Sequence, residues 1–188
     1  MKTIKTEIDG VVILEPEIHR DSRGYFFESW TRRDADRLLG PVDFVQENQS
    51  RSTIGVVRGL HFQRPPHAQA KLVSVISGRV LDVAVDLRAG SPTYGRWIAV
   101  ELSDENHRRL FIPRGFAHGY SVLSPEAVFT YKCDNYYAPE SEGGIAWDDP
   151  DLAIDWQTGP REPIISDKDR RHGSWADFAS PFKYDKKQ

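Results

Sequence analysis

Short runs of β-branched and aromatic residues, separated by glycine and proline, extend through most of this chain. The 188 residues include 14 glycines and 12 prolines, and both residue types interrupt regular secondary structure. Many short strands at close spacing with few helices are typical of β-sandwiches and β-barrels. The pattern therefore predicts an all-β fold.

Seven runs fit strands by composition and by alternation of apolar and polar residues. Two of them flank Ser77-Gly78, a dipeptide typical of a tight turn, which predicts a β-hairpin. The expected strands are Val11–Leu14, Lys71–Ile76, Arg79–Leu87, Trp97–Leu102, Arg109–Ile112, Gly119–Leu123 and Ala127–Cys133.

One helix is expected near the N-terminus. Thr31 can cap it, with Asp34 three residues later, and Gly40 can end it. From about residue 148 the periodicity is weak, so the tail is expected to form loops and short helices packed on the β core. The length fits a single domain covering residues 1–188.

Charge and cysteine content limit the partners and the compartment. The formal net charge of −3 argues against nucleic-acid binding. No apolar run approaches the roughly 20 residues of a membrane helix, and the N-terminus has no apolar signal core. Cys133 is the single cysteine, which excludes an intrachain disulfide and favours the reducing cytoplasm.

The stretch VVRGLHFQRPPHAQAKLV, residues 56–73, places basic and protonatable side chains among strand-forming residues. A metal site is one interpretation, because PRGFAH at residues 113–118 resembles the second motif of cupin jelly rolls. In metal-binding cupins the first motif carries two histidines and an acid, but here Gln63 takes the second histidine position. His61 and His118 supply two ligands where zinc or iron needs about three, and Lys71 would repel a cation. We therefore expect no bound metal, and His118 alone could also be a hydrogen-bonded core residue.

An anion site is the second interpretation. Arg23 and Arg58 each precede a glycine within apolar or aromatic segments, and arginine pairs with phosphate through two hydrogen bonds. Phe26 and Glu28 alternate, which predicts that they share one strand face. Phe26 could stack on a nucleotide base there or could equally belong to the core.

Acid–base chemistry is the third interpretation. Tyr131 shares its expected inward face with Phe129 and other apolar residues. A buried tyrosine usually only forms a hydrogen bond, but beside His61 and Lys71 it becomes a candidate proton donor. Asp169 could orient the imidazole.

Five sequence motifs help to decide among the metal, anion and acid–base interpretations. They are QENQSRSTIGVVRGLHFQ, D-x-R-G-x-F-x-E at residues 21–28, IPRGFAHG, YKCDNYYAPESEGGIAWDDPDLAIDW and ISDKD. Over about residues 3–170 the chain closely resembles the dTDP-4-dehydrorhamnose 3,5-epimerases. The resemblance implies a cupin jelly roll, a homodimer and catalysis without a metal or other cofactor.

The resemblance also implies the reaction and the residues that perform it. The expected substrate is dTDP-4-dehydro-6-deoxy-glucose, and the expected product is dTDP-4-dehydro-L-rhamnose. His61 matches the catalytic base, Tyr131 the acid and Lys71 the cation near the enolate oxygen. Asp169 matches the partner of the histidine, with Asp167 as the alternative.

The resemblance also implies the substrate-binding residues. His118 is expected to contribute a second imidazole near the reacting sugar, and Arg58 is expected near the sugar and phosphates. Other side chains are expected at the nucleotide end. The resemblance implies that the partner subunit's N-terminal strands complete the nucleotide site. The binding residues are Arg23, Phe26, Glu28, Gln46, Asn48, Arg58, His118 and Tyr137.

Three alternatives remain open at the level of sequence. Related enzymes epimerise only C5 or only C3, and residue spacing does not separate these outcomes. A metal-dependent cupin and a non-catalytic sugar-nucleotide binding protein are the other two.

Overall fold

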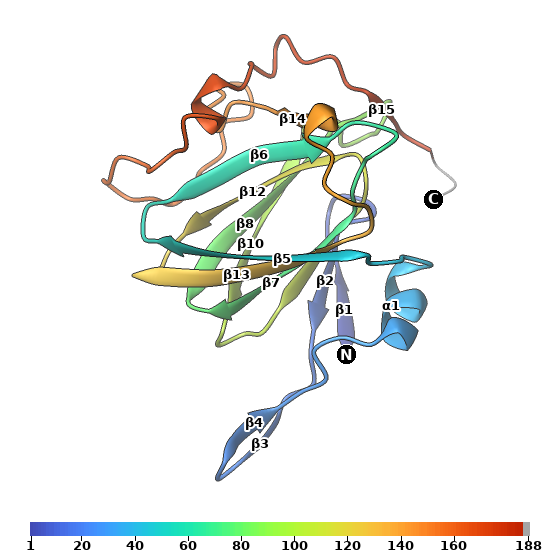
Figure 1. Ribbon diagram of the computed structural model, residues 1–188, viewed down its shortest axis with the longest axis vertical. Helices are drawn as coiled ribbons and strands as arrows, with labels where there is room; N and C mark the ends of the chain where they lie inside the picture. The colour runs from blue at the N-terminus through green and yellow to red at the C-terminus, as the bar shows by residue number, and fades with distance from the viewer. Residues whose placement is uncertain (186–188) are drawn as a thin grey trace.

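Two antiparallel β-sheets pack face to face around the hydrophobic core (Figure 1). The computed structural model describes residues 1–185. The six-stranded sheet has the order β1 (Lys2–Lys5), β2 (Val12–Glu15), β11 (Arg109–Ile112), β7 (Lys71–Ser77), β13 (Glu126–Cys133) and β5 (Gln46–Thr53). The five-stranded sheet has the order β10 (Trp97–Ser103), β8 (Arg79–Asp86), β12 (Phe116–Val122), β6 (Val57–Gln63) and β14 (Glu142–Gly144). The predicted all-β sandwich is confirmed.

The predicted hairpin at Ser77-Gly78 is wrong. Strand β7 pairs with β11 and β13 in one sheet, whereas β8 pairs with β10 and β12 in the other. Gly78 has a φ of 82°, and a Cβ there would lie 2.1 Å from the carbonyl oxygen of Glu126. The glycine therefore serves a tight corner between the sheets. Local alternation and a turn glycine look the same at such a corner and in a hairpin.

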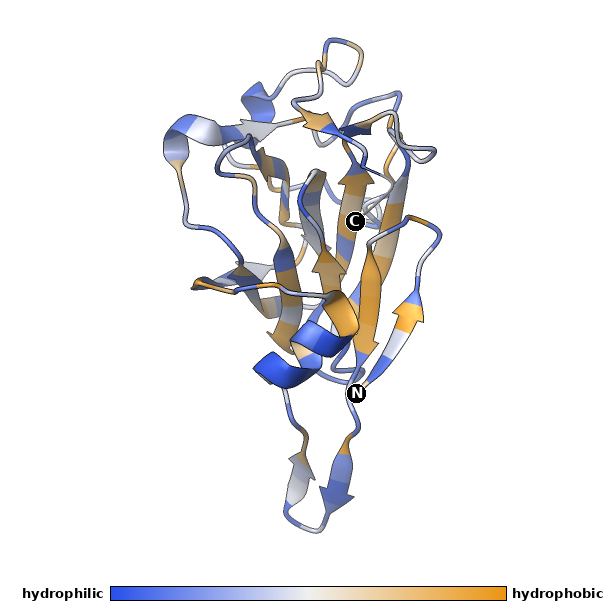
Figure 2. Ribbon diagram, turned by 90° about the vertical axis from the view of Figure 1, so that its right-hand side faces the viewer, coloured by the Kyte–Doolittle hydropathy of each residue, from blue (hydrophilic) through white to orange (hydrophobic). Residues whose placement is uncertain are grey.

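The five-stranded sheet is covered on both faces. Its inner face shares a cluster with the six-stranded sheet that includes Val73, Leu110 and Phe129. Its outer face packs against aromatic residues of the C-terminal part of the chain, among them Trp156 and Phe182. Every residue of β12 is buried as a result. Figure 2 shows the apolar strands inside the sandwich.

Few helices accompany the sheets. Helix α1 (Arg32–Leu39) begins after Thr31, whose hydroxyl accepts a hydrogen bond from the Asp34 amide, and ends at Gly40, as predicted. Two short 3₁₀ helices, η1 (Pro139–Ser141) and η2 (Asp169–Arg171), and the small pair β9 (Arg88–Ala89) and β15 (Phe182–Lys183) complete the framework. No helix within residues 1–185 combines the length and hydropathy of a membrane span.

A two-stranded hairpin, β3 (His19–Asp21) with β4 (Gly24–Phe26), extends away from the sandwich (Figure 1). All six strand residues are exposed, and Phe26 is 72% exposed. Strand β4 ends at Phe26, so the prediction that Glu28 shares its strand face is wrong. Alternation over three residues was too short to define where the strand stops.

The shared core predicts a large stability loss from one truncation. Leu110 lies in the middle strand pairs of the six-stranded sheet and is fully buried. We expect Leu110→Ala to lower the free energy of unfolding by about 2–5 kcal/mol, through lost burial and an added cavity. Urea unfolding measures this change. The matched control Ile164→Ala, at an exposed position, should stay within about 0.5 kcal/mol, and equal losses in both variants would contradict the assignment of the core.

Candidate active site

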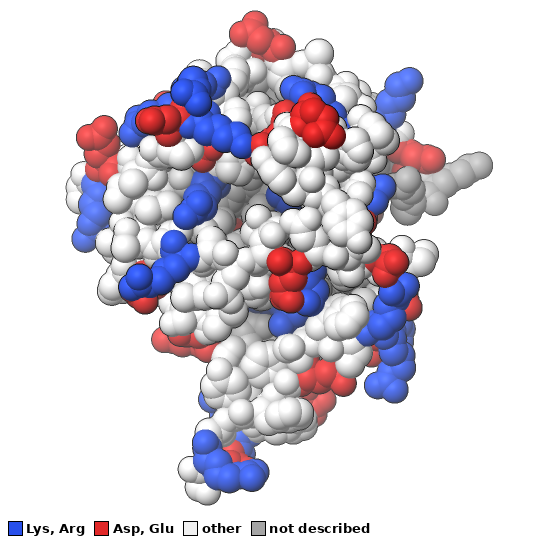
Figure 3. Space-filling model, in the orientation of Figure 1, with Lys and Arg blue, Asp and Glu red and all other residues white. Residues whose placement is uncertain are grey.

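A cavity between the two sheets contains most of the polar residues singled out from the sequence. Its outer part has a volume of about 350 Å³ and its inner part about 250 Å³. The two parts share His61, Lys71, Tyr131 and Glu142. In Figure 3 the face of the molecule is hollowed near its centre, with charged side chains around the hollow. A cavity of this size suits a small ligand with a few well-placed polar contacts.

His61 comes from β6 and is held by Asp169 of η2. The His61 Nε2 lies 2.7 Å from Asp169 Oδ1, and the Gly59 amide donates to Asp169 Oδ2 at 3.3 Å. Burial would raise the pKa of Asp169, but the hydrogen bonds from His61 and Gly59 outweigh it and lower the pKa. The carboxylate is therefore ionised at neutral pH and accepts the Nε2 proton. His61 Nδ1 then remains as the basic nitrogen.

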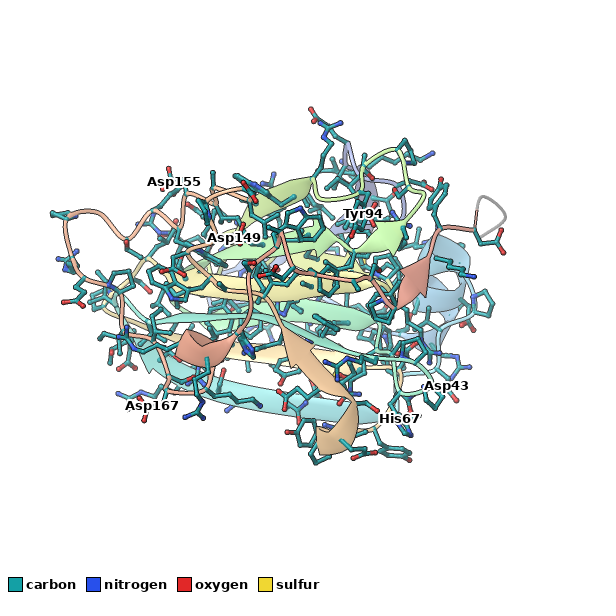
Figure 4. The ribbon with its side chains drawn as sticks, turned by 90° about the horizontal axis from the view of Figure 1, so that it is seen from above. Asp43, His67, Tyr94, Asp149, Asp155 and Asp167 are labelled. Carbon is teal, nitrogen blue, oxygen red and sulfur yellow. The ribbon has the colours of Figure 1, made fainter. Side chains whose placement is uncertain are left out.

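The choice between Asp169 and Asp167 follows from their positions. Asp169 is buried against His61, whereas Asp167 is exposed. Figure 4 shows Asp167 at the periphery of the molecule. The structure brings only Asp169 to the imidazole, because η2 turns residue 169 inward.

Tyr131 reaches the cavity from the opposite sheet. It lies on β13, where Phe129 and Cys133 share its inward face as predicted. Burial raises the pKa of Tyr131, so the phenol stays protonated at neutral pH. His61 from one sheet and Tyr131 from the other thus line the same space.

Lys71 and His118 also line the cavity. Burial lowers the pKa of Lys71, while the Asp82 and Glu142 carboxylates oppose that shift. The His118 Nε2 lies 2.9 Å from Asp82 Oδ2, with both residues buried. Burial lowers the pKa of His118 and favours its neutral form. The structure therefore places a lysine and a second imidazole at the inner part of the cavity.

The outer part of the cavity carries amides and a phenol. Gln46 and Asn48 on β5 are joined by a hydrogen bond of 3.0 Å, and Gln46 Oε1 accepts from the Tyr137 amide at 2.9 Å. The Tyr137 hydroxyl donates to Glu142 at 2.9 Å. These contacts place three predicted binding residues around one opening.

The remaining predicted binding residues fall into two groups. Arg58 lines the inner cavity and donates to Ser52 Oγ at 3.1 Å. Arg23 pairs with Asp21 on the protruding hairpin, and Phe26 lies beside it. Glu28 accepts a hydrogen bond from the Thr31 hydroxyl. Arg23, Phe26 and Glu28 line neither part of this chain's cavity.

Gln63 was considered from the sequence only as a missing metal ligand. Its buried amide donates to the carbonyls of His67 and Tyr136 at 2.7 and 3.1 Å and accepts from the Ala138 amide at 2.8 Å. With both amide atoms engaged, Gln63 ties the segment around Tyr137 to β6.

Two further residues of the site escaped the sequence analysis. Glu142 lines both parts of the cavity and forms an ion pair with Lys168. Asp82 lies within hydrogen-bond distance of His118. Outside the cavity, His172 packs beside His61 with ring centroids 5.7 Å apart and lines neither part of the cavity. Acidic residues in loops and strands are common, so no local pattern marked Glu142 or Asp82, although the period of two does point Asp82 and Ala84 to the same face of β8.

Comparison with known proteins identifies the family. The family model described as dTDP-4-dehydrorhamnose 3,5-epimerase matches residues 5–177. This chain belongs to that family. The resemblance predicted from the ordered motifs is thus confirmed, and with it the isomerase class.

Individual relatives of this epimerase family cover nearly the whole chain. The dTDP-4-dehydrorhamnose 3,5-epimerase of Methanothermobacter thermautotrophicus is 54% identical, over 89% of this chain and 90% of that protein. The crystal structure of dTDP-6-deoxy-D-glucose-3,5-epimerase RmlC from Legionella pneumophila, in complex with dTDP-4-keto-L-rhamnose, has a TM-score of 0.93 and 49% identity, covering 98% of both chains. ChmJ, a 3′-monoepimerase from Streptomyces bikiniensis in complex with dTDP-quinovose, has a TM-score of 0.85 and 35% identity, covering 91% of this chain and 86% of that chain.

The three hydrogen bonds of the Gln63 amide lead to a prediction about the segment around Tyr137 at the outer part of the cavity. In Gln63→Glu the carboxylate can still accept from Ala138 but faces two carbonyl oxygens without a proton to donate. We expect the free energy of unfolding to fall by about 1–3 kcal/mol and the affinity for dTDP to fall because the segment around Tyr137 is released. Urea unfolding and calorimetric titration measure the two effects. The exposed control Gln157→Glu should leave both unchanged, and an unaltered Gln63→Glu protein would show that another contact holds this segment.

Proposed function

We propose that this epimerase converts dTDP-4-dehydro-6-deoxy-α-D-glucose to dTDP-4-dehydro-β-L-rhamnose by inverting C3 and C5. The observation that carries the proposal is the pair His61 and Tyr131, which face one cavity from opposite sheets. Inversion of a carbon requires removal of a proton from one face and its return from the other. A base and an acid on opposite walls meet that requirement.

The C4 ketone makes the chemistry possible. It acidifies the hydrogens on the neighbouring carbons C3 and C5, and it takes up the electron pair when either proton leaves. No redox cofactor is needed, since the substrate is neither oxidised nor reduced. Each inversion therefore passes through an enolate whose negative charge lies on O4.

His61 starts each inversion by taking the proton through Nδ1. The resulting imidazolium is stabilised by Asp169, which already accepts the Nε2 proton at 2.7 Å. The C–H electron pair moves into the ring and the ketone π electrons move to O4. Lys71 stabilises this oxyanion, where a preorganised charge in a buried site is most effective.

Tyr131 completes the inversion from the opposite face. Its protonated phenol donates a proton to the carbon, and the electron pair returns from O4 to restore the ketone. Afterwards His61 carries an extra proton and Tyr131 lacks one, so exchange with water resets both groups. His118 contributes a second polar contact near O4.

The nucleotide end of the substrate is proposed to lie in the outer cavity. Arg58 lines the inner part and contacts the diphosphate where it joins the sugar, because guanidinium groups pair well with phosphate oxygens. Gln46 and Asn48 offer amides to the base and sugar, and the half-exposed ring of Tyr137 is available for stacking. The enzyme is placed in the cytoplasm on the basis of its single, unpaired cysteine.

Isotope exchange tests the two proton carriers separately. We expect His61→Ala to lower both solvent deuterium incorporation and epimerisation by roughly 10²–10⁴. Tyr131→Phe keeps the base and loses the acid, so deuterium should enter C3 and C5 faster than configuration is inverted. NMR of the product formed in D₂O measures both.

The same spectra decide between one and two inversions. Label and inversion at both carbons support the proposed reaction, whereas label at only C3 or only C5 would replace it with a mono-epimerase. An active wild-type enzyme whose product carries no solvent label at either carbon would exclude proton transfer altogether.

We also propose that the enzyme is a homodimer whose partner completes the nucleotide site. Arg23 and Phe26 lie on a hairpin that extends beyond this chain's cavity, with basic side chains at its tip (Figure 3). A second cavity of about 550 Å³ lies on the outer face of the six-stranded sheet, lined by Tyr25, Phe27 and Ile76 among others. Exposed aromatic groups of this kind favour association with another protein surface.

Mixed dimers test whether the site is shared. The variants His61→Ala and Arg23→Ala/Phe26→Ala should each have little activity alone. When they are co-expressed, half of the dimers are mixed, and each mixed dimer has one intact site, so activity should recover to about a quarter of wild type. Activity no greater than the sum of the two parents would show that one chain forms the whole site.

A further inference from the structure

His172 lies largely buried beside the proposed catalytic pair without a role in the proposed reaction. Its side chain is 13% exposed, and its Nε2 is fully buried without a hydrogen-bond partner among residues 1–185. Asp169 Oδ1 lies 3.6 Å from this nitrogen, which is too long for a hydrogen bond. Buried polar atoms almost always have a hydrogen-bond partner, so the lack of one at His172 Nε2 needs an explanation.

The position of His172 is defined on several sides. It follows η2, so it lies one turn after Asp169. Its ring covers Gly144, where a Cβ would meet three ring atoms at 2.4–2.5 Å. Gly144 is the direct pairing partner of His61 in the sheet. The ring is therefore held next to His61 and does not turn freely.

Three potential ligand atoms converge at this point. His61, Asp169 and His172 each offer one ligand atom, and these three atoms all lie within 4.8 Å of one another. The two distances to Asp169 Oδ1 are 2.7 and 3.6 Å. Ligand atoms around a tetrahedral zinc ion lie ~3.3 Å apart, given bonds of about 2.0–2.1 Å. Small shifts of the two imidazoles would therefore accommodate one ion.

The geometry points to an inhibitory site for a divalent transition-metal ion such as Zn²⁺, held by His61, Asp169 and His172. Two imidazoles and a carboxylate form a typical three-ligand zinc set with one open position. This set differs from the cupin ligand positions considered above, because it uses η2 and the residue after it.

On balance, the charged side chains around the three proposed ligands favour the binding of a cation. The Asp169 carboxylate is ionised and shared by both imidazoles. Glu142 interacts electrostatically with His61 and with His172. Lys168 opposes binding, but it is paired with Glu142.

Occupation of this site would stop catalysis through the tautomer of His61. Metal on Nε2 leaves the neutral ring with its proton on Nδ1, the nitrogen that must accept the substrate proton. The proton moves from Nε2 to Nδ1 through solvent, and the ion takes its place against Asp169. The base is then blocked although no part of the nucleotide pocket is covered.

The test combines inhibition with metal spectroscopy on the full-length enzyme after chelator treatment. Initial rates are measured with increasing ZnCl₂ in a non-chelating buffer. We expect wild type to lose activity, EDTA to restore it, and one Zn²⁺ to bind per chain. His172→Asn should keep the metal-free rate within about twofold and raise the half-inhibitory concentration at least about tenfold, since one of three protein ligands is lost.

A spectroscopic readout without substrate separates this inference from the proposed reaction. Co²⁺ bound by wild type should give the intense visible absorption of a tetrahedral site, and both His172→Asn and His61→Ala should lose it. The matched control His67→Asn, at a histidine paired with Ser141 instead, should behave as wild type. Equal zinc sensitivity of wild type and His172→Asn, or a Co²⁺ spectrum that survives in His172→Asn, would overturn the site.

Discussion

The pairing of ionisable side chains between two apolar sheets is the constraint on which the site depends. Removing a charged or polar group from water costs free energy, and a hydrogen-bond or ion-pair partner offsets that cost. His61 is matched with Asp169 and His118 with Asp82, and each pair joins different elements of the fold. The same contacts that make burial tolerable therefore also fix the orientation of each imidazole.

The cavity is part of the sandwich core rather than an addition to it. On β13 the period of two places Phe129 in the core and Tyr131 at the cavity, so one strand face serves both. On β6 Leu60 and Phe62 are buried in the cluster under the C-terminal segment, while His61 between them lines both parts of the cavity. A change in core packing would therefore displace Tyr131 or His61 directly. Both proposed proton carriers thus lie on strands of the rigid sandwich and not on loops.

Predictions from the sequence were correct where a local residue pattern alone is enough to define the structure. Alternation placed Tyr131 inward, and the cap at Thr31 defined α1, because both depend on neighbouring residues alone. The turn at Gly78 could not be read as a corner between sheets, because strand partners come from distant parts of the chain. Likewise the choice of Asp169 over Asp167 depended on the turn of η2, and the contact between Glu142 and the cavity depended on the short strand β14.

The outer face of the six-stranded sheet carries a largely buried arginine next to exposed aromatic side chains. Burial lowers the pKa of Arg109 to about 10, with only the charge of Glu47 opposing that shift. Both residues line the cavity that Tyr25 and Phe27 border. Aromatic and arginine side chains are enriched in protein–protein interfaces, so the composition of this face fits the dimer contact proposed above. The hairpin that carries Arg23 leaves the sandwich next to this face, so association through it would deliver the hairpin to a neighbouring cavity and join assembly to completion of the substrate site.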